Sequence, residues 1–397
     1  RTIFQLNRAS NWDDFLNAIR TFKSISQNIN YADTKGNIGL YCAAGVPVRK
    51  RVPGFEILPG WTDEFDWQGF VPFEELPFTF NPGKGFVASA NSKTVGNDYP
   101  YHIGKWFSMP YRMNRINDLL SSETKYTPEM VKSMQSDVES DLARDFSDEI
   151  VSVVQGIKDL TDIEKEGLNL IRKWDFKMQS EQVAPLLFEE LYNTLFENAF
   201  SDEMGDSLFR EFIKVTKLPK VALANIWNIP ESPWWDNIHT SGIEKMNDVL
   251  VSTFKQVISK LEKQFGADIN NWSWGRAHQL TLEHPLGSVS LLNRFFNLNK
   301  GPFNVGGSYH TIMPYSYPFV ERYKVNHGAS QRHIYDLADW DNSWTVIPTG
   351  VSGVPASQFY GNQAELYVNN KYHRDWFSKE NVMANALYVQ NYLPKNE

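Results

Sequence analysis

The sequence has one cysteine, Cys42, among its 397 residues, and it has no long hydrophobic run. A single cysteine excludes an intramolecular disulfide and a thiolate zinc cluster. Cys42 alternates with apolar neighbours, which predicts a buried structural thiol. No run approaches the roughly 18 apolar residues that a membrane-spanning helix needs, so no membrane span is expected.

The sequence also lacks a concentrated basic region and low-complexity tracts. Its formal net charge is −8, and acidic and basic residues are interspersed. Nucleic-acid binding requires a concentrated basic surface, so nucleic acid is not an expected partner. An apolar share of 42% in a chain of this length predicts a globular protein with a substantial core and room for two domains.

The most informative stretch that is present runs from residue 85 to residue 116. Apolar and small or polar residues alternate over 85–92, which predicts a strand that ends at Asn91. A carboxamide at a strand end can donate a hydrogen bond to a developing oxyanion. Arg112 follows at the start of an apolar-periodic helix, from which its side chain can reach back toward Asn91. Taken singly, Asn91 suits a turn and Arg112 suits a solvated surface, so spacing alone leaves both interpretations open.

Residues 1–126 predict a β-rich part of the core. Asn11 is suited to cap a short helix that packs on a sheet. The apolar patterns of 25–32 and 38–44 flank a turn signal and predict a β-hairpin. Residues 47–82 are rich in proline, glycine and aromatic residues, which predicts a long irregular loop held by aromatic anchors.

Residues 127–266 predict a mainly helical insertion. Thr127 with Pro128 opens a helix whose apolar positions recur every four residues as far as Ile150. A further helix is expected at about 181–196.

Two capping-box patterns mark other helix starts in the insertion, and a glycine marks one helix end. The boxes are Thr161-(x)2-Glu164 and Ser241-(x)2-Glu244, and Gly266 is the stop signal.

Residues 267–397 predict a C-terminal β-rich segment that returns to the core. Strand patterns occur at 332–337 and 344–347. The run Gly350-Val351-Ser352-Gly353 does not have the spacing of a nucleophile elbow and predicts a tight turn instead. Histidines lack the helical spacing that a metal site with a carboxylate partner shows, so no metal site is expected from His278, His284, His310 and His333.

Several ordered blocks of the chain resemble the penicillin acylase (penicillin amidase) family of N-terminal-nucleophile hydrolases. The blocks are Asn30-Tyr31-Ala32-Asp33 with Gly36-Asn37-Ile38-Gly39; Gly45-Val46-Pro47-Val48-Arg49; Gly85-(x)5-Asn91 with Tyr99-Pro100 and Tyr111-Arg112-(x)2-Arg115-Ile116; Gln135 with Asp137; Trp272-Ser273-Trp274-Gly275-(x)2-His278; Gly328-Ala329-Ser330-Gln331-Arg332 with Asp336 and Asp339; and Gly350-Val351-Ser352-Gly353 with Ser357, Tyr360 and Gln363.

The resemblance implies an α+β fold that is part of a four-layer αββα sandwich, with residues 127–266 as a helical insertion. It implies an amidohydrolase that cleaves the amide between a hydrophobic acyl group and an amine, as in β-lactam side chains or acyl-homoserine lactones. Asn91 would be the oxyanion-hole asparagine and Arg112 the active-site arginine. Related roles in antibiotic biosynthesis or resistance and in quorum quenching, and a periplasmic or secreted location, are implied in the same way.

One departure from the family bears on mechanism. The family's nucleophile is the first residue of a mature β chain, which autoproteolytic processing of a zymogen exposes, whereas this sequence begins with Arg1. The expectation is therefore that the sequence corresponds to the C-terminal part of a β chain. Its expected partners are the α chain and the N-terminal part of the β chain, and the sequence by itself is expected to be inactive.

The resemblance implies no cofactor. Some relatives hold a structural calcium through a carboxylate shortly after the oxyanion asparagine, but the corresponding stretch here is Tyr101-His102-Ile103, without a carboxylate.

Two other functions are considered. A glycoside hydrolase would explain the 13 tryptophans and the carboxylates of the aromatic loop, which are Asp63, Glu64, Asp66, Glu74 and Glu75. A non-catalytic relative could retain the scaffold as a binding module.

Overall fold

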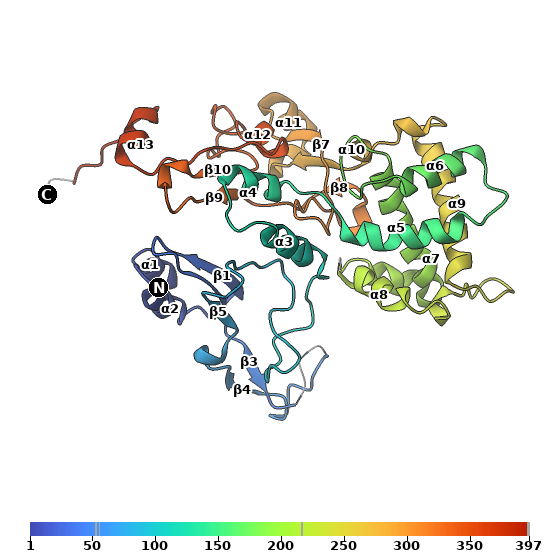
Figure 1. Cartoon of the computed structure of the whole chain (residues 1–397), viewed down its shortest axis with the longest axis horizontal. Coiled ribbons are helices and arrows are strands. Elements are labelled where there is room, and N and C mark those ends of the chain that lie inside the picture. Colours follow the sequence, from blue (N-terminus) through green and yellow to red (C-terminus); the bar gives the residue numbers. More distant parts are fainter. Residues whose placement is uncertain (52–53, 55, 216, 395–397) are drawn as a thin grey trace. The chain divides into compact units, whose positions relative to one another are not determined.

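The chain forms two compact units in the computed structural model, Arg1–Thr124 and Lys125–Glu397 (Figure 1). The structure describes residues 1–51, 54, 56–215 and 217–394. The second unit contains both the expected helical insertion and the C-terminal segment, while the three-part division of the sequence stays a prediction. None of the helices in the described residues combines the length and the apolar character needed to cross a membrane.

The described part of the first unit holds an antiparallel sheet of order β1-β2-β5, a β3–β4 pair and three α-helices. The expected β-hairpin is confirmed, with Gln27 opposite Ala43 and Ala32 opposite Ile38. The elements are α1 (Thr2–Leu6), α2 (Trp12–Ile19), β1 (Gln27–Ala32), β2 (Ile38–Ala43), β3 (Pro47–Arg49), β4 (Trp67–Phe70), β5 (Phe78–Phe80) and α3 (Tyr111–Ser121).

Helix α2 covers one face of the β1-β2-β5 sheet. The Asn11 side chain accepts a hydrogen bond from the Asp14 backbone N–H at 2.9 Å, so the expected N-cap is confirmed. Trp12 stacks on Phe80 of β5 with ring centroids 4.6 Å apart. Phe15 lies in the core of this unit, where it is 5% exposed. Burial of these aromatic side chains stabilises the unit.

The expectation of an irregular loop over residues 47–82 is wrong in part. Strands β3 and β4 pair with each other, and β5 pairs with β2. Some backbone N–H and C=O groups of this stretch are therefore hydrogen-bonded between antiparallel strands. Aromatic anchoring is also limited, because Phe73 is 8% exposed whereas Trp61 is 90% exposed. Residues 52–53 and 55 of the stretch lie outside the described residues.

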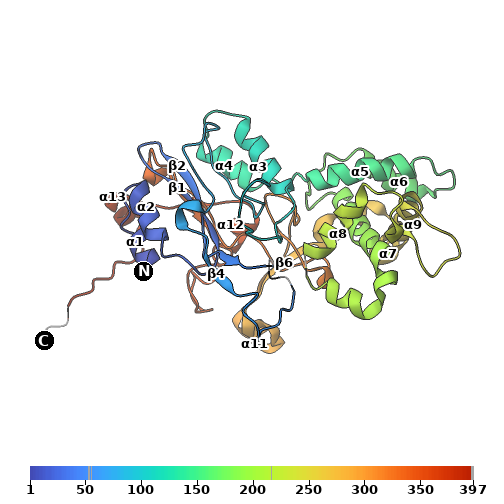
Figure 2. The same cartoon turned by 90° about the horizontal axis from the view of Figure 1, so that it is seen from below.

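The second unit gathers its long helices at one end and its short strands at the other, as Figures 1 and 2 both show. One sheet has the order β7-β6-β8 and another the order β11-β10-β9. The expected strands near 332 and 344 are confirmed in shorter form. The elements are α4 (Pro128–Gln135), α5 (Asp141–Val154), α6 (Asp162–Arg172), α7 (Ala184–Phe212), α8 (Lys217–Trp227), α9 (Met246–Phe265), α10 (Trp274–Ala277), β6 (Gln279–Leu282), α11 (Ser290–Phe296), β7 (Lys300–Asn304), β8 (Lys324–Val325), β9 (Arg332–Ile334), β10 (Trp344–Val346), α12 (Ala364–Val368), β11 (His373–Arg374) and α13 (Lys379–Asn385).

The single helix expected from Thr127 to Ile150 is two helices, α4 and α5. The predicted N-cap Thr127 is confirmed, since its side chain accepts from the Met130 N–H. The chain leaves the helix because the Ser140 N–H donates to the Phe176 carbonyl at 2.9 Å instead of to a preceding turn. Ser140 then caps α5 through its side chain. Apolar periodicity of four continues across this break and therefore does not reveal it.

Helix starts in the insertion agree with one of the two predicted capping boxes. At α6 the Thr161 N–H donates to Glu164 at 2.7 Å and the Glu164 N–H donates to Thr161, so that box is confirmed. The prediction of a capping box at Ser241 is wrong. The Glu244 carboxylate accepts a hydrogen bond from the Thr240 hydroxyl at 2.7 Å, and α9 begins only at Met246.

Two glycines shape the ends and interior of the long helices. Gly266 has φ of 92°, and it ends α9 as expected. Helix α7 is longer than the expected 181–196 segment and extends to Phe212, with a non-helical Gly205 at φ of 66° inside it. Glycine reaches this left-handed conformation without a steric penalty, so the helix kinks there.

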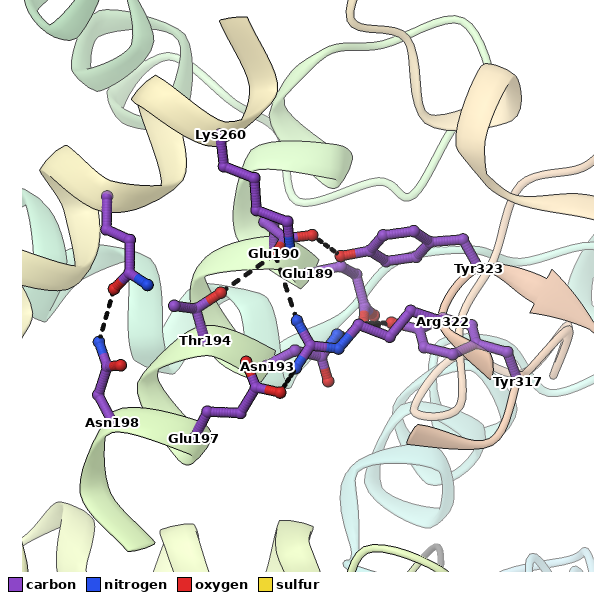
Figure 3. Close-up of polar contacts among 11 residues, drawn as sticks. Glu189, Glu190, Asn193, Thr194, Glu197, Asn198, Lys260, Tyr317, Arg322 and Tyr323 are labelled. Carbon is purple, nitrogen blue, oxygen red and sulfur yellow. Dashed lines mark hydrogen bonds and ion pairs between the residues drawn. The ribbon is translucent and has the colours of Figure 1, made fainter. Parts of the chain in front are cut away.

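A buried polar network joins α7 to α9 and to the segment of Tyr317, Arg322 and Tyr323 (Figure 3). Glu190 is fully buried and accepts from Lys260, Arg322 and Tyr323. Burial alone would raise the pKa of Glu190, but the hydrogen bonds from Lys260 and Tyr323 and the Arg322 charge outweigh it and lower that pKa. The carboxylate thus stays ionised inside the unit, held by two cations.

Candidate active site

The stretch of the first unit around Asn91 is irregular, so the strand predicted over 85–92 is wrong. Residues 86–89 form no strand pairing. The physical reason lies at both ends, where Gly85 has φ of 78° and Asn91 has φ of 61°, values outside the strand region. Contact with β1 is made by side chains instead, since Asn28 donates to the Ser89 hydroxyl at 2.9 Å.

Asn91 occupies the left-handed backbone region, which a non-glycine residue seldom adopts. Asparagine tolerates this conformation better than most residues. The Ser108 N–H donates to the Asn91 carbonyl at 2.9 Å and fixes the turn from the other side. The carboxamide is exposed. A non-glycine residue held in this region by its surroundings is frequent at functional sites.

Arg112 is the second residue of α3, as the sequence predicts. Its Nη2 atom donates to the Asn91 Oδ1 atom at 2.9 Å, to the Ala90 carbonyl at 3.1 Å and to the Ser108 hydroxyl at 3.4 Å. The structure therefore brings the two predicted site residues together, although they are separated by a long loop.

The direction of the contact determines what Asn91 can do. Its amide oxygen is occupied by the guanidinium, which leaves the Nδ2 atom as the donating end. Across the described ranges of the chain, Nδ2 donates to no protein acceptor. A cation on the oxygen also polarises the amide and strengthens its N–H groups as donors. The pair thus presents a fixed neutral donor backed by a positive charge.

The position of Arg112 is not explained by helix stability. A cation in the first turn of a helix opposes the helix dipole, and the first turn of α3 holds no acidic residue. The three hydrogen bonds of Nη2 to Ala90, Asn91 and Ser108 give the side chain a reason to be there.

Ser108 is the member of this arrangement that sequence reasoning missed. It contacts both predicted residues, through its N–H to Asn91 and its hydroxyl to Arg112. The available signal was weak: a single hydroxyl residue two positions before Pro110 at a helix start.

Four of the five carboxylates named for a glycoside hydrolase are engaged in ion pairs or hydrogen bonds, namely Asp63, Glu64, Glu74 and Glu75. Glu64 pairs with Arg51 at 3.1 Å, and Glu74 pairs with Arg20. The hydrogen bond from Arg20 lowers the pKa of Glu74. A glycosidic general acid needs the opposite shift, because it must be protonated near neutral pH.

The histidines considered as metal ligands have structural surroundings. His278 is buried, its Nδ1 atom lies 2.9 Å from the Val305 carbonyl, and burial lowers its pKa to about 4. His284 accepts from the Leu286 N–H at 3.1 Å and caps a short 3-10 helix. Among the residues that the structure describes, no three His, Cys, Asp or Glu side chains form a group suited to a metal ion.

The C-terminal motifs serve packing in the second unit. Trp274 is buried and stacks on His278 with ring centroids 4.2 Å apart. A Cβ at Gly275 would meet Asn304 at 2.8 Å, and one at Gly350 would meet the Phe359 carbonyl at 2.1 Å. These glycines allow close approach of the backbone.

Cys42 is half-buried, so the thiol is less buried than the expectation of a buried structural thiol implies. Its side chain alternates with the buried Tyr41 and Ala43. Burial raises the pKa of the thiol, which favours the unreactive protonated form.

Comparison with known proteins assigns this fold to a class. The structure superposes on the thermostable penicillin G acylase from Alcaligenes faecalis with a TM-score of 0.65 and 18% identity, covering 100% of this chain and 72% of that one. The mixed α/β fold is thus that of a penicillin G acylase. The penicillin amidase family model matches residues 1–384, and the chain belongs to that family.

Curated relatives give the same family. Acyl-homoserine lactone acylase QuiP of Pseudomonas fluorescens (strain Pf0-1) is 24% identical over 383 residues, which cover 93% of this chain and 46% of that protein. The penicillin acylase 2 proenzyme of Pseudomonas sp. (strain SE83) is 24% identical over 388 residues, which cover 97% of this chain and 48% of that protein. The chain therefore spans about half the length of the curated relatives it matches.

Proposed function

We propose that this chain provides the oxyanion donor and the orienting arginine of an amidohydrolase. The substrate class is an amide between a hydrophobic acyl group and an amine, either a β-lactam side chain or an acyl-homoserine lactone. The observation that carries the proposal is the 2.9 Å hydrogen bond from Arg112 to the Asn91 oxygen, which leaves the Asn91 N–H groups to donate. The names of the relatives support the substrate class.

The proposed reaction is acyl transfer through an N-terminal serine. The hydroxyl oxygen attacks the amide carbonyl while the α-amine of the same residue accepts the hydroxyl proton. The carbonyl oxygen becomes an oxyanion, to which Asn91 Nδ2 donates. The carbon–nitrogen bond then breaks, the leaving amine takes the proton, and water hydrolyses the acyl-enzyme to a free carboxylate.

The nucleophile is proposed to lie in a part of the whole protein outside these 397 residues. Two observations support this: the chain covers only 46% to 48% of the relatives, and one of them is named a proenzyme. In the same proposal the whole enzyme is processed autocatalytically, completes a four-layer αββα sandwich with an α chain, needs no cofactor, and is periplasmic or secreted. The 397-residue chain by itself is accordingly inactive.

Two Asn→Gly variants of the whole gene product test the role of Asn91. Both Asn91 and Asn81 have positive φ, 61° and 47°, so glycine suits the backbone at each. Asn91→Gly loses the donor, and a loss of about a hundredfold to a thousandfold in kcat is expected. Asn81→Gly loses hydrogen bonds to Ile38 and Asn37 and should alter stability while kcat remains.

The kinetic comparison uses an acyl-homoserine lactone and a penicillin with an apolar side chain as substrates. Equal kcat for the wild type and Asn91→Gly would remove Asn91 from the mechanism. Turnover by the 397-residue chain alone would contradict the placement of the nucleophile. If the whole gene product hydrolyses neither substrate although it is correctly folded, the binding-module alternative is favoured.

A further inference from the structure

A cavity of about 240 Å³ lies within the second unit, between α4, the segment 312–315, β9 and α12. Its walls are mainly apolar, with Ile312, Met313 and Pro314 on one part of the lining. Its lining residues include no aspartate or glutamate. All of them belong to the second unit, whereas Asn91 and Arg112 belong to the first, so this cavity is independent of the proposed amidohydrolase function.

Arg332 contributes a buried positive charge to this cavity. The residue is 6% exposed. Its guanidinium donates to the Asn370 side-chain oxygen at 2.5 Å and to the Tyr367 carbonyl, both of which are neutral acceptors. The Nε atom is buried and has no hydrogen-bond partner. Within the described parts of the chain, Arg332 makes no ion pair.

A buried charge without a counter-ion is unfavourable, because the interior replaces water poorly around it. The ring of Tyr367 lies 4.5 Å from the guanidinium carbon and the ring of Tyr372 lies 5.4 Å from it, so the cation has aromatic contacts. These contacts do not neutralise the charge. The buried charge of Glu190 in the same unit, unlike that of Arg332, is paired with two ions of opposite charge.

A second polar group without a partner lines the same cavity. Tyr315 is 1% exposed, and its hydroxyl has no hydrogen-bond partner. Burial raises the pKa of Tyr315, and the nearby charge of Arg332 acts on it in the opposite direction, so the hydroxyl is a protonated donor near a cation. Unpaired buried donors are rare in folded proteins and call for an explanation such as a bound ligand.

We propose that this cavity binds a small organic carboxylate with an apolar tail. The carboxylate accepts hydrogen bonds from Arg332 Nε and from the Tyr315 hydroxyl, which supplies the missing counter-charge. The tail lies against Ile312, Met313 and Pro314. A phosphate is less suited, because a dianion would require more cationic donors than the single buried guanidinium provides.

Calorimetric titration of the 397-residue chain with hexanoate and with hexanamide tests this. The two probes share shape and differ in charge. Hexanoate should bind with one-to-one stoichiometry and about tenfold to a hundredfold more tightly than hexanamide, as expected for a charge-assisted hydrogen bond. Tyr315→Phe keeps the ring and should weaken hexanoate binding severalfold, and Arg332→Gln should abolish it.

Arg374→Gln is the matched control. Arg374 belongs to the same sheet, donates to Asn342 and lies over the Trp344 ring, but it does not line the cavity. Hexanoate binding should be unchanged in this variant. If Arg332→Gln does not fold, the comparison of hexanoate with hexanamide and the Tyr315→Phe variant still test whether the cavity binds a carboxylate.

Equal affinity of hexanoate and hexanamide, absence of saturable binding, or unchanged binding in Tyr315→Phe would each overturn the proposal. The titration is repeated with the whole gene product. Binding by the 397-residue chain but not by the whole product would mean that another part of the protein covers or fills the site, which also overturns the small-molecule proposal.

Discussion

At the scale of single residues, Asn91 and Arg112 form a unit in which each fixes the other. Arg112 Nη2 donates to the Ala90 carbonyl, the Asn91 oxygen and the Ser108 hydroxyl, and the bond to the Asn91 oxygen determines how the carboxamide points. The sequence predicts both residues and their proximity. It does not predict the mode of contact, because the positive φ of Asn91 and the Ser108 hydrogen bonds are set by the turn between them.

Arg112→Met should reduce kcat of the whole gene product by about tenfold to a hundredfold, because one charge-assisted hydrogen bond to Asn91 is lost. The carboxamide would then be free to rotate, so Arg112→Lys should recover part of the rate. Steady-state kinetics measure the effect. Arg8→Met is the control, since Arg8 lies over the Phe4 ring in the same unit and should leave kcat unchanged. Identical kcat in Arg112→Met and wild type would refute the orienting role.

Glu203 makes the stability of the second unit depend on pH. Burial and the neighbouring Asp202 raise the pKa of Glu203 to about 7. A carboxyl whose folded pKa is raised above 4.5 stabilises the fold below pH 4.5, and that contribution is lost as pH rises through 7. Glu203→Gln should therefore leave Tm nearly unchanged at pH 4 relative to wild type.

At pH 8 the same variant should have a Tm about 2–4 °C higher than wild type, corresponding to about 1 kcal/mol after allowance for solvent screening of a partly exposed group. Thermal unfolding followed by circular dichroism at the two pH values measures this. Glu211→Gln, at a surface ion pair with Lys214, is the matched control for the substitution itself. A Tm difference of the same size at both pH values would argue against the titration of Glu203.

At the scale of elements, local signals identify helix starts only when their side chains are not used elsewhere. Thr161 and Glu164 bond to each other's backbone, so the box that the sequence predicts forms. Ser241 and Glu244 have the same spacing, but Glu244 is used by the Asn237 N–H and the Thr240 hydroxyl of the preceding loop. A tertiary contact thus overrides the local pattern.

Thr161→Ala should lower the free energy of unfolding by about 1 kcal/mol, because the N-terminus of α6 loses a cap. Ser241→Ala is the control, because Ser241 does not cap α9 in the structure. This substitution should change that free energy by less than about 0.5 kcal/mol. Urea denaturation at pH 7 compares the two variants. Equal destabilisation by both substitutions would contradict the helix starts described above.

The fold itself is predictable from the sequence to the extent that its contacts are local. The hairpin of β1 and β2, the Asn11 cap and the end of α9 at Gly266 follow from spacing and turn chemistry. The division of α4 from α5 does not, since it depends on the pairing of the Ser140 N–H with the distant Phe176 carbonyl. Pairings of this kind leave no periodic trace in the sequence.

At the scale of the whole molecule, the chain divides into two compact units between residues 124 and 125. Residues 122–125 are exposed and lie between α3 and α4. Limited trypsin digestion should therefore cut after Lys125 and leave a fragment of 126–397 that resists further digestion, because its core is buried.

Mass spectrometry of the fragments over time tests this prediction. Lys125→Gln should prevent the cut and delay the appearance of the fragment. Degradation of 126–397 as fast as the intact chain, with no accumulation, would show that the second unit does not hold together once separated.

The buried carboxylate of Glu190 has a consequence for how the protein is made. Its partners Arg322 and Tyr323 lie 132 and 133 residues further along the chain. At ribosomal speeds of about 5–20 residues per second, α7 emerges roughly 7 to 27 seconds before the last partner. During that interval, closing α7 into the interior would bury a charge without its full set of cations. Nascent α7 is therefore expected to stay water-exposed until Tyr323 has been synthesised.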